Sequence, residues 1–202
     1  MDLTDSSKLY QQLKQLLIRL CDSDEVDNIE SELVNSFSVM TLSAGQRFVS
    51  EGEVPPSLGF VCNGLLKYYY IDSDGNEWIK HFSAENDFVS SYGAFLYQTP
   101  SLYYIEAIEE VVLLTIPFKV FNKNIDKSLF WSTIARKYTE YIYYQKEKRE
   151  ASFLQLDGTE RYQAFLNEYP NLVNRISIKD TASFLGLTSV SLSRIRNKLS
   201  SN

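Results

Sequence analysis

The sequence predicts an α+β fold, in which an antiparallel jelly-roll barrel precedes a long helix and a C-terminal helix-turn-helix. Short β-rich runs separated by Gly, Pro and Asn fill the stretch from Phe37 to Ile116. A helical pattern without Gly or Pro runs from Lys127 to about Leu156. Two short helical segments with a glycine between them follow between Ile176 and Leu199. The β-rich runs therefore predict the barrel, the uninterrupted helical pattern predicts the long helix, and the two short segments predict the helix-turn-helix.

Two helices are expected before the barrel. Within residues 3–20, leucines recur at helical spacing, which is typical of an amphipathic helix; they are Leu9, Leu13, Leu16, Leu17 and Leu20. A second, shorter helix is expected from Asp24 to Val34.

The β-rich part has the pattern of roughly eight short strands, which predicts an antiparallel barrel or jelly roll. Asn63-Gly64 and Asp74-Gly75 favour hairpin turns whose twist matches that of the flanking strands. The expected strands are Phe37–Leu42, Gln46–Ser50, Leu58–Cys62, Leu65–Ile71, Glu77–Phe82, Asp87–Val89, Tyr103–Ala107 and Val111–Ile116.

Helices are expected in the middle of the chain, a short one from Phe118 to Asn124 and then the long one. The long helix would extend about 45 Å at about 1.5 Å per residue. Its first half is rich in apolar and aromatic residues, namely Phe130, Trp131, Ile134, Tyr138, Tyr141, Ile142 and Tyr144. We expect this half to pack against its twin in a homodimer; the alternative is that the barrel alone covers it. Asp157-Gly158 should break the helix, and a further helix should run from Thr159 to Glu168.

The segment from Ile176 to Leu199 has the pattern of two short helices joined by a tight corner. Ser177 or Lys179 opens the first helix, and Gly186 supplies the left-handed conformation that ends it. Thr188 or Ser189 caps the second helix, whose expected apolar residues are Val190, Leu192, Ile195 and Leu199. The spacing of Ala182, Gly186 and Leu192, with small polar residues and arginines on the second helix, favours a DNA-binding helix-turn-helix over an ordinary helical hairpin.

The composition is that of a folded globular protein, with 202 residues of which 44% are hydrophobic and 23% charged. No apolar run approaches the roughly 18 residues that span a bilayer, and the N-terminus with Asp2 and Asp5 lacks a signal-peptide core. Cys21 and Cys62 form no CxxC pair, which favours a reducing cytoplasm and excludes a zinc or iron–sulfur site. With one histidine, His81, we expect no metal, no haem, no cofactor and no catalytic triad.

The net charge of −6 is unevenly distributed along the chain. Residues 1–34 carry eight acidic and three basic side chains, whereas residues 175–202 carry five basic and one acidic side chain. The basic end coincides with the helix-turn-helix, so the overall acidity does not argue against a nucleic-acid partner.

The order of barrel, long helix and helix-turn-helix resembles the Crp–Fnr family of bacterial transcription regulators. The matching motifs are Leu-Ser-Ala-Gly-Gln at 42–46, Glu-Gly at 51–52, Asn-Gly at 63–64, Asn-Asp-Phe-Val at 86–89 and the segment 178–196. The resemblance implies a cyclic-nucleotide-binding-like barrel with its helical N-terminus at 1–117, helices including a dimerisation helix at 118–156 and a winged helix-turn-helix at 157–202. It also implies a cytoplasmic homodimer that binds double-stranded DNA and contacts RNA polymerase.

The family's cyclic AMP ligands do not carry over to this chain. An ungapped match places Ser90-Ser91 where relatives have a Gly-Glu pair, and Ser101-Leu102 where they have Arg-Ser. A buried phosphate without a cation is poorly compensated, and no Arg or Lys lies between Lys80 and Lys119. The pocket would instead be lined by Phe88, Ser90, Ser91, Tyr92, Ser101, Tyr103 and Tyr104, with Phe95 and Tyr97 nearby. These rings either close the space or form a site for an unidentified apolar or aromatic effector that controls DNA binding.

The DNA-reading residues match the family only in part. Ser189 and Val190 stand where relatives often have Arg-Glu, and Arg194 matches the later Arg, which can read guanine. The expected DNA contacts are Lys179, Thr188, Ser189, Ser191, Arg194, Arg196 and Lys198. The function that follows is that of a sequence-specific transcription regulator, and the residues give no support for an enzyme.

Overall fold

The computed structural model describes residues 3–21 and 30–200 of the chain. The chain divides into two compact units, one comprising Met1–Tyr68 and Phe82–Glu140 and the other Tyr69–His81 and Tyr141–Asn202. The division passes through one β-hairpin and through the long helix, so each unit takes part of both.

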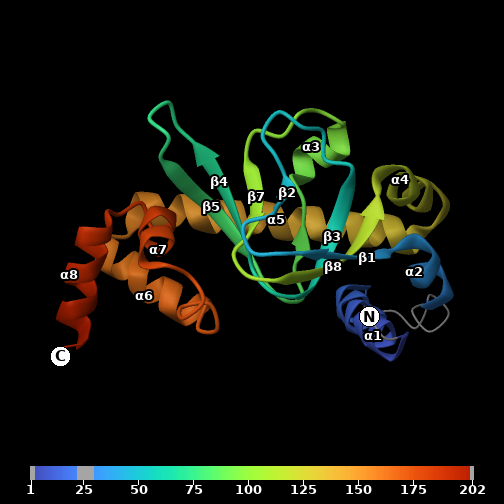
Figure 1. Cartoon of the computed structure of the whole chain (residues 1–202), viewed down its shortest axis with the longest axis horizontal. Coiled ribbons are helices and arrows are strands. Elements are labelled where there is room, and N and C mark those ends of the chain that lie inside the picture. The colour runs from blue at the N-terminus through green and yellow to red at the C-terminus, as the bar shows by residue number, and fades with distance from the viewer. Residues whose placement is uncertain (1–2, 22–29, 201–202) are drawn as a thin grey trace. The chain divides into compact units, whose positions relative to one another are not determined.

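Eight strands in the described residues form two four-stranded sheets, with the orders β1-β8-β3-β6 and β2-β7-β4-β5 (Figure 1). The pairings of β1 and β3 with β8, of β3 with β6 and of β2 with β7 are antiparallel. Each predicted strand is confirmed to within one residue at either end. The strands are β1 (Ser38–Leu42), β2 (Arg47–Val49), β3 (Ser57–Asn63), β4 (Leu66–Ile71), β5 (Glu77–Ser83), β6 (Phe88–Val89), β7 (Tyr104–Ala107) and β8 (Val111–Pro117).

The barrel core of the first unit follows from the alternation of side chains along its strands. In β7, Ile105 and Ala107 are buried while Tyr104 and Glu106 lie on the other face. Leu113 and Val61 join Ile105 in one buried apolar cluster. The two faces of β7 decide which of its residues can line the barrel interior.

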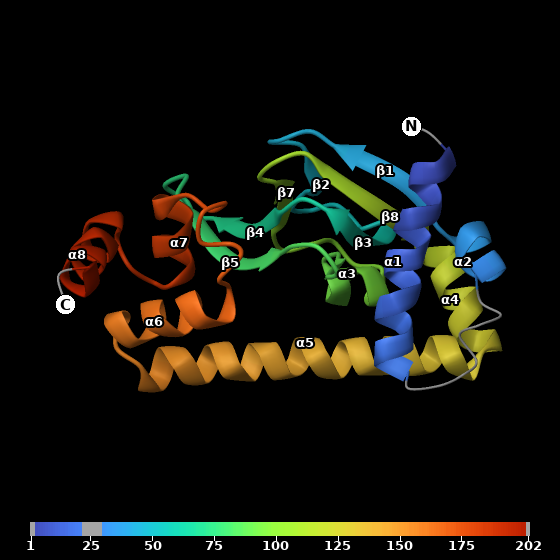
Figure 2. The same ribbon diagram turned by 90° about the horizontal axis from the view of Figure 1, so that it is seen from below.

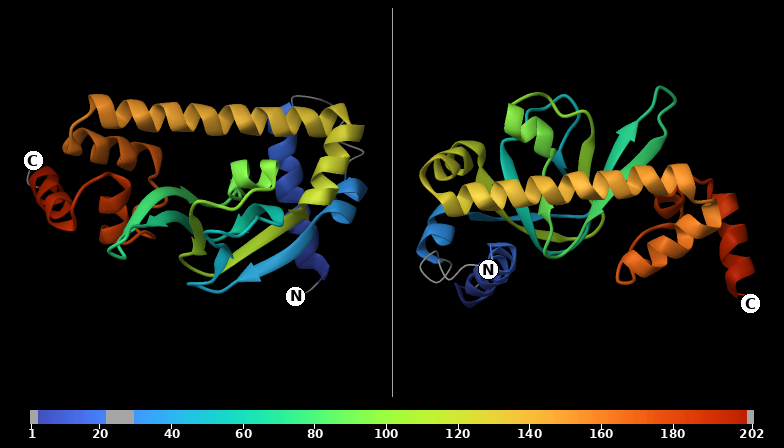
Figure 3. Two further views of the ribbon diagram at one scale, coloured as in Figure 1. Left: turned by 90° about the horizontal axis from the view of Figure 1, so that it is seen from above. Right: turned by 180° about the vertical axis from the view of Figure 1, so that it is seen from behind.

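Two N-terminal helices, α1 (Leu3–Cys21) and α2 (Glu30–Ser36), pack in the first unit (Figure 3). Leu13 and Leu17 of α1 are buried, as the leucine spacing predicted. Tyr10 Oη donates a hydrogen bond of 3.0 Å to the Phe37 carbonyl. The predicted helix from Asp24 to Val34 lies partly outside the described residues, and its described part ends at Ser36 instead.

Three further helices come later in the chain. The short α3 (Tyr92–Tyr97) lies between β6 and β7, and α4 (Phe118–Lys127) and the long α5 (Leu129–Gln155) follow β8. The sequence pattern did not predict α3. The long helix begins two residues later than expected because Ser128 is extended, with φ −136° and ψ 125°.

The first part of the aromatic run of α5 is covered within one chain, whereas Tyr141 and Tyr144 further along stay exposed. Phe130, Trp131 and Ile134 are buried, and Trp131 Nε1 donates a 2.7 Å hydrogen bond to Glu32 Oε1. The Tyr138 hydroxyl donates to the Phe88 carbonyl at 3.0 Å. For the first part of the aromatic run, the structure therefore shows the alternative, in which the same chain covers these residues.

The second unit holds α6 (Gly158–Glu168), α7 (Ile178–Phe184) and α8 (Ser189–Ser200), with the end of α5 and the tip of the β4–β5 hairpin (Figure 2). Asp157 caps α6 in a reciprocal capping box with Glu160. Ser177 caps α7 through the Asp180 amide, which selects it over Lys179.

The predicted wing is not found in the described part of this unit, where no strand lies between Gly158 and Ser200. Residues 169–177, which connect α6 to α7, are held in successive tight turns such as Leu172 N to Tyr169 O and Arg175 N to Leu172 O. The backbone amides and carbonyls of these turns bond to each other within a few residues, so the connection forms no strand ladder.

The glycine corner provides a stability prediction for the second unit. Gly186 has φ +66°, and a Cβ there would lie 2.7 Å from Phe153 Cε1. We expect Gly186→Ala to lower the free energy of unfolding by about 1–2 kcal/mol for the backbone alone, and by more because of the contact with Phe153. Urea unfolding followed by circular dichroism measures the change.

Two glycines serve as matched controls for this measurement. Gly75 has φ +82° with open space around the Cβ position, so Gly75→Ala should show only the backbone loss. Gly93 lies in α3 with open space, so Gly93→Ala should be neutral or stabilising. If Gly186→Ala and Gly75→Ala lower the free energy of unfolding equally, the contact of the new Cβ with Phe153 adds no cost and the prediction is wrong.

Candidate functional site

The corner between α7 and α8 is built as the sequence pattern predicted. Gly186 adopts the left-handed conformation, and the Leu187 amide donates back to the Ala182 carbonyl at 2.8 Å. Ala182 and Leu192 are buried, each about 1% exposed, so the two helices meet through one small and one large apolar side chain. Thr188, not Ser189, caps α8, since its Oγ1 accepts from the Ser191 amide at 3.1 Å.

Two arginines from outside the motif bind the C-terminal carbonyls of α7. Arg149 Nη2 donates to the Phe184 carbonyl at 2.9 Å, and Arg161 Nε donates to the Leu185 carbonyl at 3.0 Å. Carbonyls at a helix end have no partner within the helix, and a cation there also complements the helix dipole. The two guanidinium groups therefore fix the point at which the chain turns toward α8.

Aromatic rings hold these guanidinium groups in place. Arg149 lies 4.3 Å from the ring centroid of Phe184 and 4.8 Å from that of Phe153, and Arg161 lies 5.1 Å from Phe153. Burial lowers the pKa of Arg149 from its ordinary value to about 10. Because that value is still far above neutral pH, Arg149 keeps its charge.

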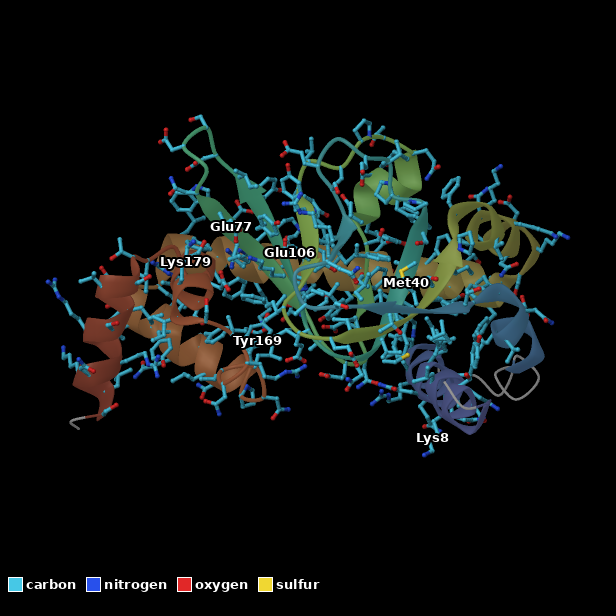
Figure 4. All side chains as sticks on the ribbon, in the orientation of Figure 1. Lys8, Met40, Glu77, Glu106, Tyr169 and Lys179 are labelled. Carbon is cyan, nitrogen blue, oxygen red and sulfur yellow. The ribbon has the colours of Figure 1, made fainter. Side chains whose placement is uncertain are left out.

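A serine of α7 joins the helix to the tip of the β4–β5 hairpin. Ser183 Oγ donates to the Glu77 carbonyl at 3.0 Å and accepts from the Ile79 amide at 2.9 Å. Arg149 also donates to the Ile79 carbonyl, at 3.3 Å. Figure 4 labels Glu77 on β5 and Lys179 on α7. The hairpin tip is thus hydrogen-bonded to the first helix of the motif.

The second helix of the motif has one buried and one exposed face. Leu192 is buried, and Ile195 and Leu199 are partly buried on the same side. Val190 does not join them, which corrects the prediction that it packs inward. At about 100° per residue, Val190 lies about 200° from Leu192, and its side chain is 61% exposed. Its face is shared with Ser193, Arg194 and Asn197, all exposed.

The residues expected to contact DNA are only partly on one face. Arg194 is exposed on the outer face of α8, while Arg196 and Lys198 are exposed toward its two flanks. Lys179 is exposed on α7. Thr188 and Ser191 bond to each other at 2.9 Å between their hydroxyls, so both take part in the cap of α8. Ser189 is exposed beside Val190 at the start of the helix.

The expected effector residues of the barrel bond and pack to one another. Ser90, Ser91 and Ser101 are buried. Ser90 Oγ donates to the Ser57 carbonyl at 3.1 Å, and Ser101 Oγ donates to the Tyr103 carbonyl at 2.8 Å. These hydroxyl protons therefore point to the protein backbone.

Tyr138 from α5 occupies the space between the expected pocket rings. Its ring centroid lies 5.1 Å from that of Phe88 and 4.8 Å from that of Tyr92, both edge to face. Burial, with smaller contributions from Tyr68 and Asp87, raises the pKa of Tyr138 well above its ordinary value. The sequence analysis assigned Tyr138 to a dimer interface, and its distance along the chain from β6 concealed this role.

A cavity beside these rings holds about 10 Å³, lined among others by Phe88, Tyr92, Trp131 and Tyr138. That is space for about one water molecule. Of the expected pocket residues, Phe88 and Tyr92 line this cavity.

Two of the expected pocket tyrosines lie elsewhere. Tyr104 faces away from the barrel core, with the Arg47 guanidinium 4.6 Å from its ring centroid. It shares that face with Glu106, labelled in Figure 4, which lies 3.6 Å from both Arg47 Nε and Lys67 Nζ. Tyr97 is 81% exposed at the end of α3. Tyr103 packs against the barrel core beside Tyr68.

His81, the one histidine, is a weak base at its place on β5. Burial, and then the positive charges of Lys80 and Arg149, lowers the pKa of His81 to about 3. A group with that pKa accepts a proton poorly at neutral pH. Within residues 3–21 and 30–200, no cluster of His, Cys, Asp and Glu side chains has the makings of a metal site. The helices of the same residues include none with the length and apolar character needed to cross a bilayer.

Comparison with known proteins gives a family for the barrel and a fold for the chain. Residues 39–128 match the family model described as the cyclic nucleotide-binding domain. A comparison of the sequence with curated proteins gave no significant match.

Among solved structures, three similar ones cover most of both chains. FixK2 from Bradyrhizobium japonicum has a TM-score of 0.67 and 19% identity, over 82% of this chain and 85% of the other. The c-di-GMP-responsive global regulator CLP from Xanthomonas campestris has a TM-score of 0.69 and 16% identity, over 88% of this chain and 92% of the other. A CooA mutant from Carboxydothermus hydrogenoformans has a TM-score of 0.70 and 14% identity, over 92% of this chain and 84% of the other. The chain therefore contains a cyclic nucleotide-binding domain at residues 39–128 and has the fold of these regulator structures, which confirms the fold that the resemblance to the Crp–Fnr family implied.

Proposed function

We propose that this chain is a cytoplasmic, homodimeric, sequence-specific DNA-binding regulator of transcription in which α8 enters the major groove. The observation that carries the proposal is the outer face of α8, where Val190, Ser193, Arg194 and Asn197 lie exposed beyond a tight helix-turn-helix corner. Arg194 has the length and the planar donor fork that read a guanine edge. As an activator or repressor, such a protein would also contact RNA polymerase.

The dimer is supported by the part of α5 that stays exposed. Tyr141, Tyr143 and Tyr144 are 46%, 63% and 59% exposed. Large exposed rings gathered on one stretch of helix are typical of a surface that a partner covers. The Crp–Fnr regulators that share this fold are typically dimers, and a two-fold protein matches a two-fold DNA site.

The dimer predicts a mass in solution. Light scattering at micromolar concentration should give about twice the chain mass of 23.3 kDa. Tyr143→Ser should shift the mass toward that of one chain without unfolding it, because this ring is largely exposed in the single chain. A wild-type mass equal to one chain at that concentration would contradict the dimer.

The barrel is proposed to act without a cyclic nucleotide. Tyr138 fills the space between Phe88 and Tyr92, and the buried serines donate to backbone carbonyls. The alternative is an apolar or aromatic effector, which would require these rings to move aside, because the cavity beside them is of water size.

Titration calorimetry checks this part of the proposal. Cyclic AMP and cyclic GMP at millimolar concentration should give no saturable heat, because the phosphate would find neither a cation nor an open space. Saturable binding at one site per chain would show that the rings move aside and that the barrel is a nucleotide sensor.

Arg194 gives the direct test of DNA reading. Losing a bidentate guanine contact costs about 1–3 kcal/mol per half-site and relaxes base choice there. Arg194→Ala should therefore weaken binding to a selected duplex strongly and leave binding to a scrambled duplex nearly unchanged, as measured by fluorescence anisotropy across a salt series.

Lys179→Ala is the matched control, because Lys179 is exposed on α7 and is expected at the DNA backbone. It should weaken binding to both duplexes alike and lower the salt slope by about one per half-site. If Arg194→Ala also lowers both affinities by one factor, Arg194 holds a phosphate and does not read a base.

A further inference from the structure

The exposed Val190 is the feature of α8 that neither packing nor capping explains. Its side chain is 61% exposed, whereas Leu192, Ile195 and Leu199 form the buried side of the helix. Thr188 provides the cap. Valine is also a poorer helix former than the straight-chain residues, because branching at Cβ restricts its rotamers. Neither the buried face nor helix propensity therefore accounts for a valine at this position.

The position of Val190 is that of a base-reading residue. It is the second residue of α8, and residues near the start of a recognition helix contact base edges. Residues three and four apart are neighbours on a helix surface, so Val190 lies beside Ser193 and Arg194 on the outer face. A helix that brings Arg194 to the bases brings Val190 with it.

The chemistry of valine then selects the group that it meets. Its side chain has no hydrogen-bond donor or acceptor, and the apolar group that base pairs present in the major groove is the C5-methyl of thymine. A valine placed against any other base edge would remove water from a donor or acceptor without replacing the hydrogen bond. Contact with a thymine methyl removes apolar surface from water on both sides.

We propose that Val190 is a specificity-determining residue that recognises the C5-methyl group of a thymine in each half-site. The inference rests on the proposed DNA-binding function. Four residues of helix span about 6 Å, which corresponds to about two base-pair steps of 3.4 Å. The thymine therefore lies within about two base pairs of the guanine that Arg194 reads.

Replacing single thymines by deoxyuridine tests the inference, because this change removes only the methyl group. A duplex is first selected from a random pool with the full chain, and each thymine is then replaced in turn, in both half-sites together. At one position near the guanine, the wild-type chain should lose about four-fold in affinity per half-site, the value of about one buried methyl. Val190→Ser should bind the thymine and deoxyuridine duplexes equally well.

Val190→Thr is the matched control, since it keeps one methyl group and should keep part of the discrimination. Ser193→Ala changes a neighbour on the same face and should leave the deoxyuridine effect unchanged. Circular dichroism melting should be the same for all variants, because both positions are exposed.

The outcomes separate the inference from the function beneath it. If the wild type and Val190→Ser lose the same factor at every deoxyuridine, the methyl is read by another group or through DNA shape, and the inference is wrong while sequence-specific binding stands. If the chain selects no sequence from the pool, the proposed function is wrong and the inference falls with it.

Discussion

The helix-turn-helix depends on the two guanidinium groups that bind the end of α7. Arg149 and Arg161 donate to the consecutive carbonyls of Phe184 and Leu185, the last residues before the Gly186 corner. The rings of Phe153 and Phe184 lie against the Arg149 guanidinium group at the same place. Because a carbonyl left unpaired there would cost about 1–3 kcal/mol, these contacts favour a single geometry for the turn. The outer face of α8 is then fixed by that turn.

The space beside β6 is closed by side chains of the chain itself. Tyr138 bonds to the Phe88 carbonyl and packs against the rings of Phe88 and Tyr92, and the nearby serines bond to the backbone. These contacts satisfy polar groups and fill volume at once. The same tyrosine holds the first part of α5 against the barrel, so one side chain both fills this space and covers part of the aromatic run.

The parts that the sequence predicted well are those with local physical causes. The eight strands, the Ser177 cap and the left-handed Gly186 follow from alternation, hydroxyl capping and backbone freedom, each visible within a few residues. Such signals need no knowledge of the rest of the chain.

The parts that the sequence did not predict depend on partners far away along the chain. Ser183 meets Glu77 across 106 residues, and Arg149 meets Phe184 across 35. No spacing rule connects them. Tyr104 was expected in the barrel pocket but lies on the other face of β7, because the pairing of that strand sets its two faces. Val190 was grouped with the apolar residues of α8 because its apolar character was given more weight than its angle from Leu192.

Sequence-specific recognition of DNA by α8 is the central claim, and hydroxyl-radical footprinting of the full chain on a selected duplex tests it most directly. The account predicts two protected segments on one face of the duplex, centred about 34 Å apart, one turn of the helix. A single protected segment, or uniform protection independent of sequence, would contradict it.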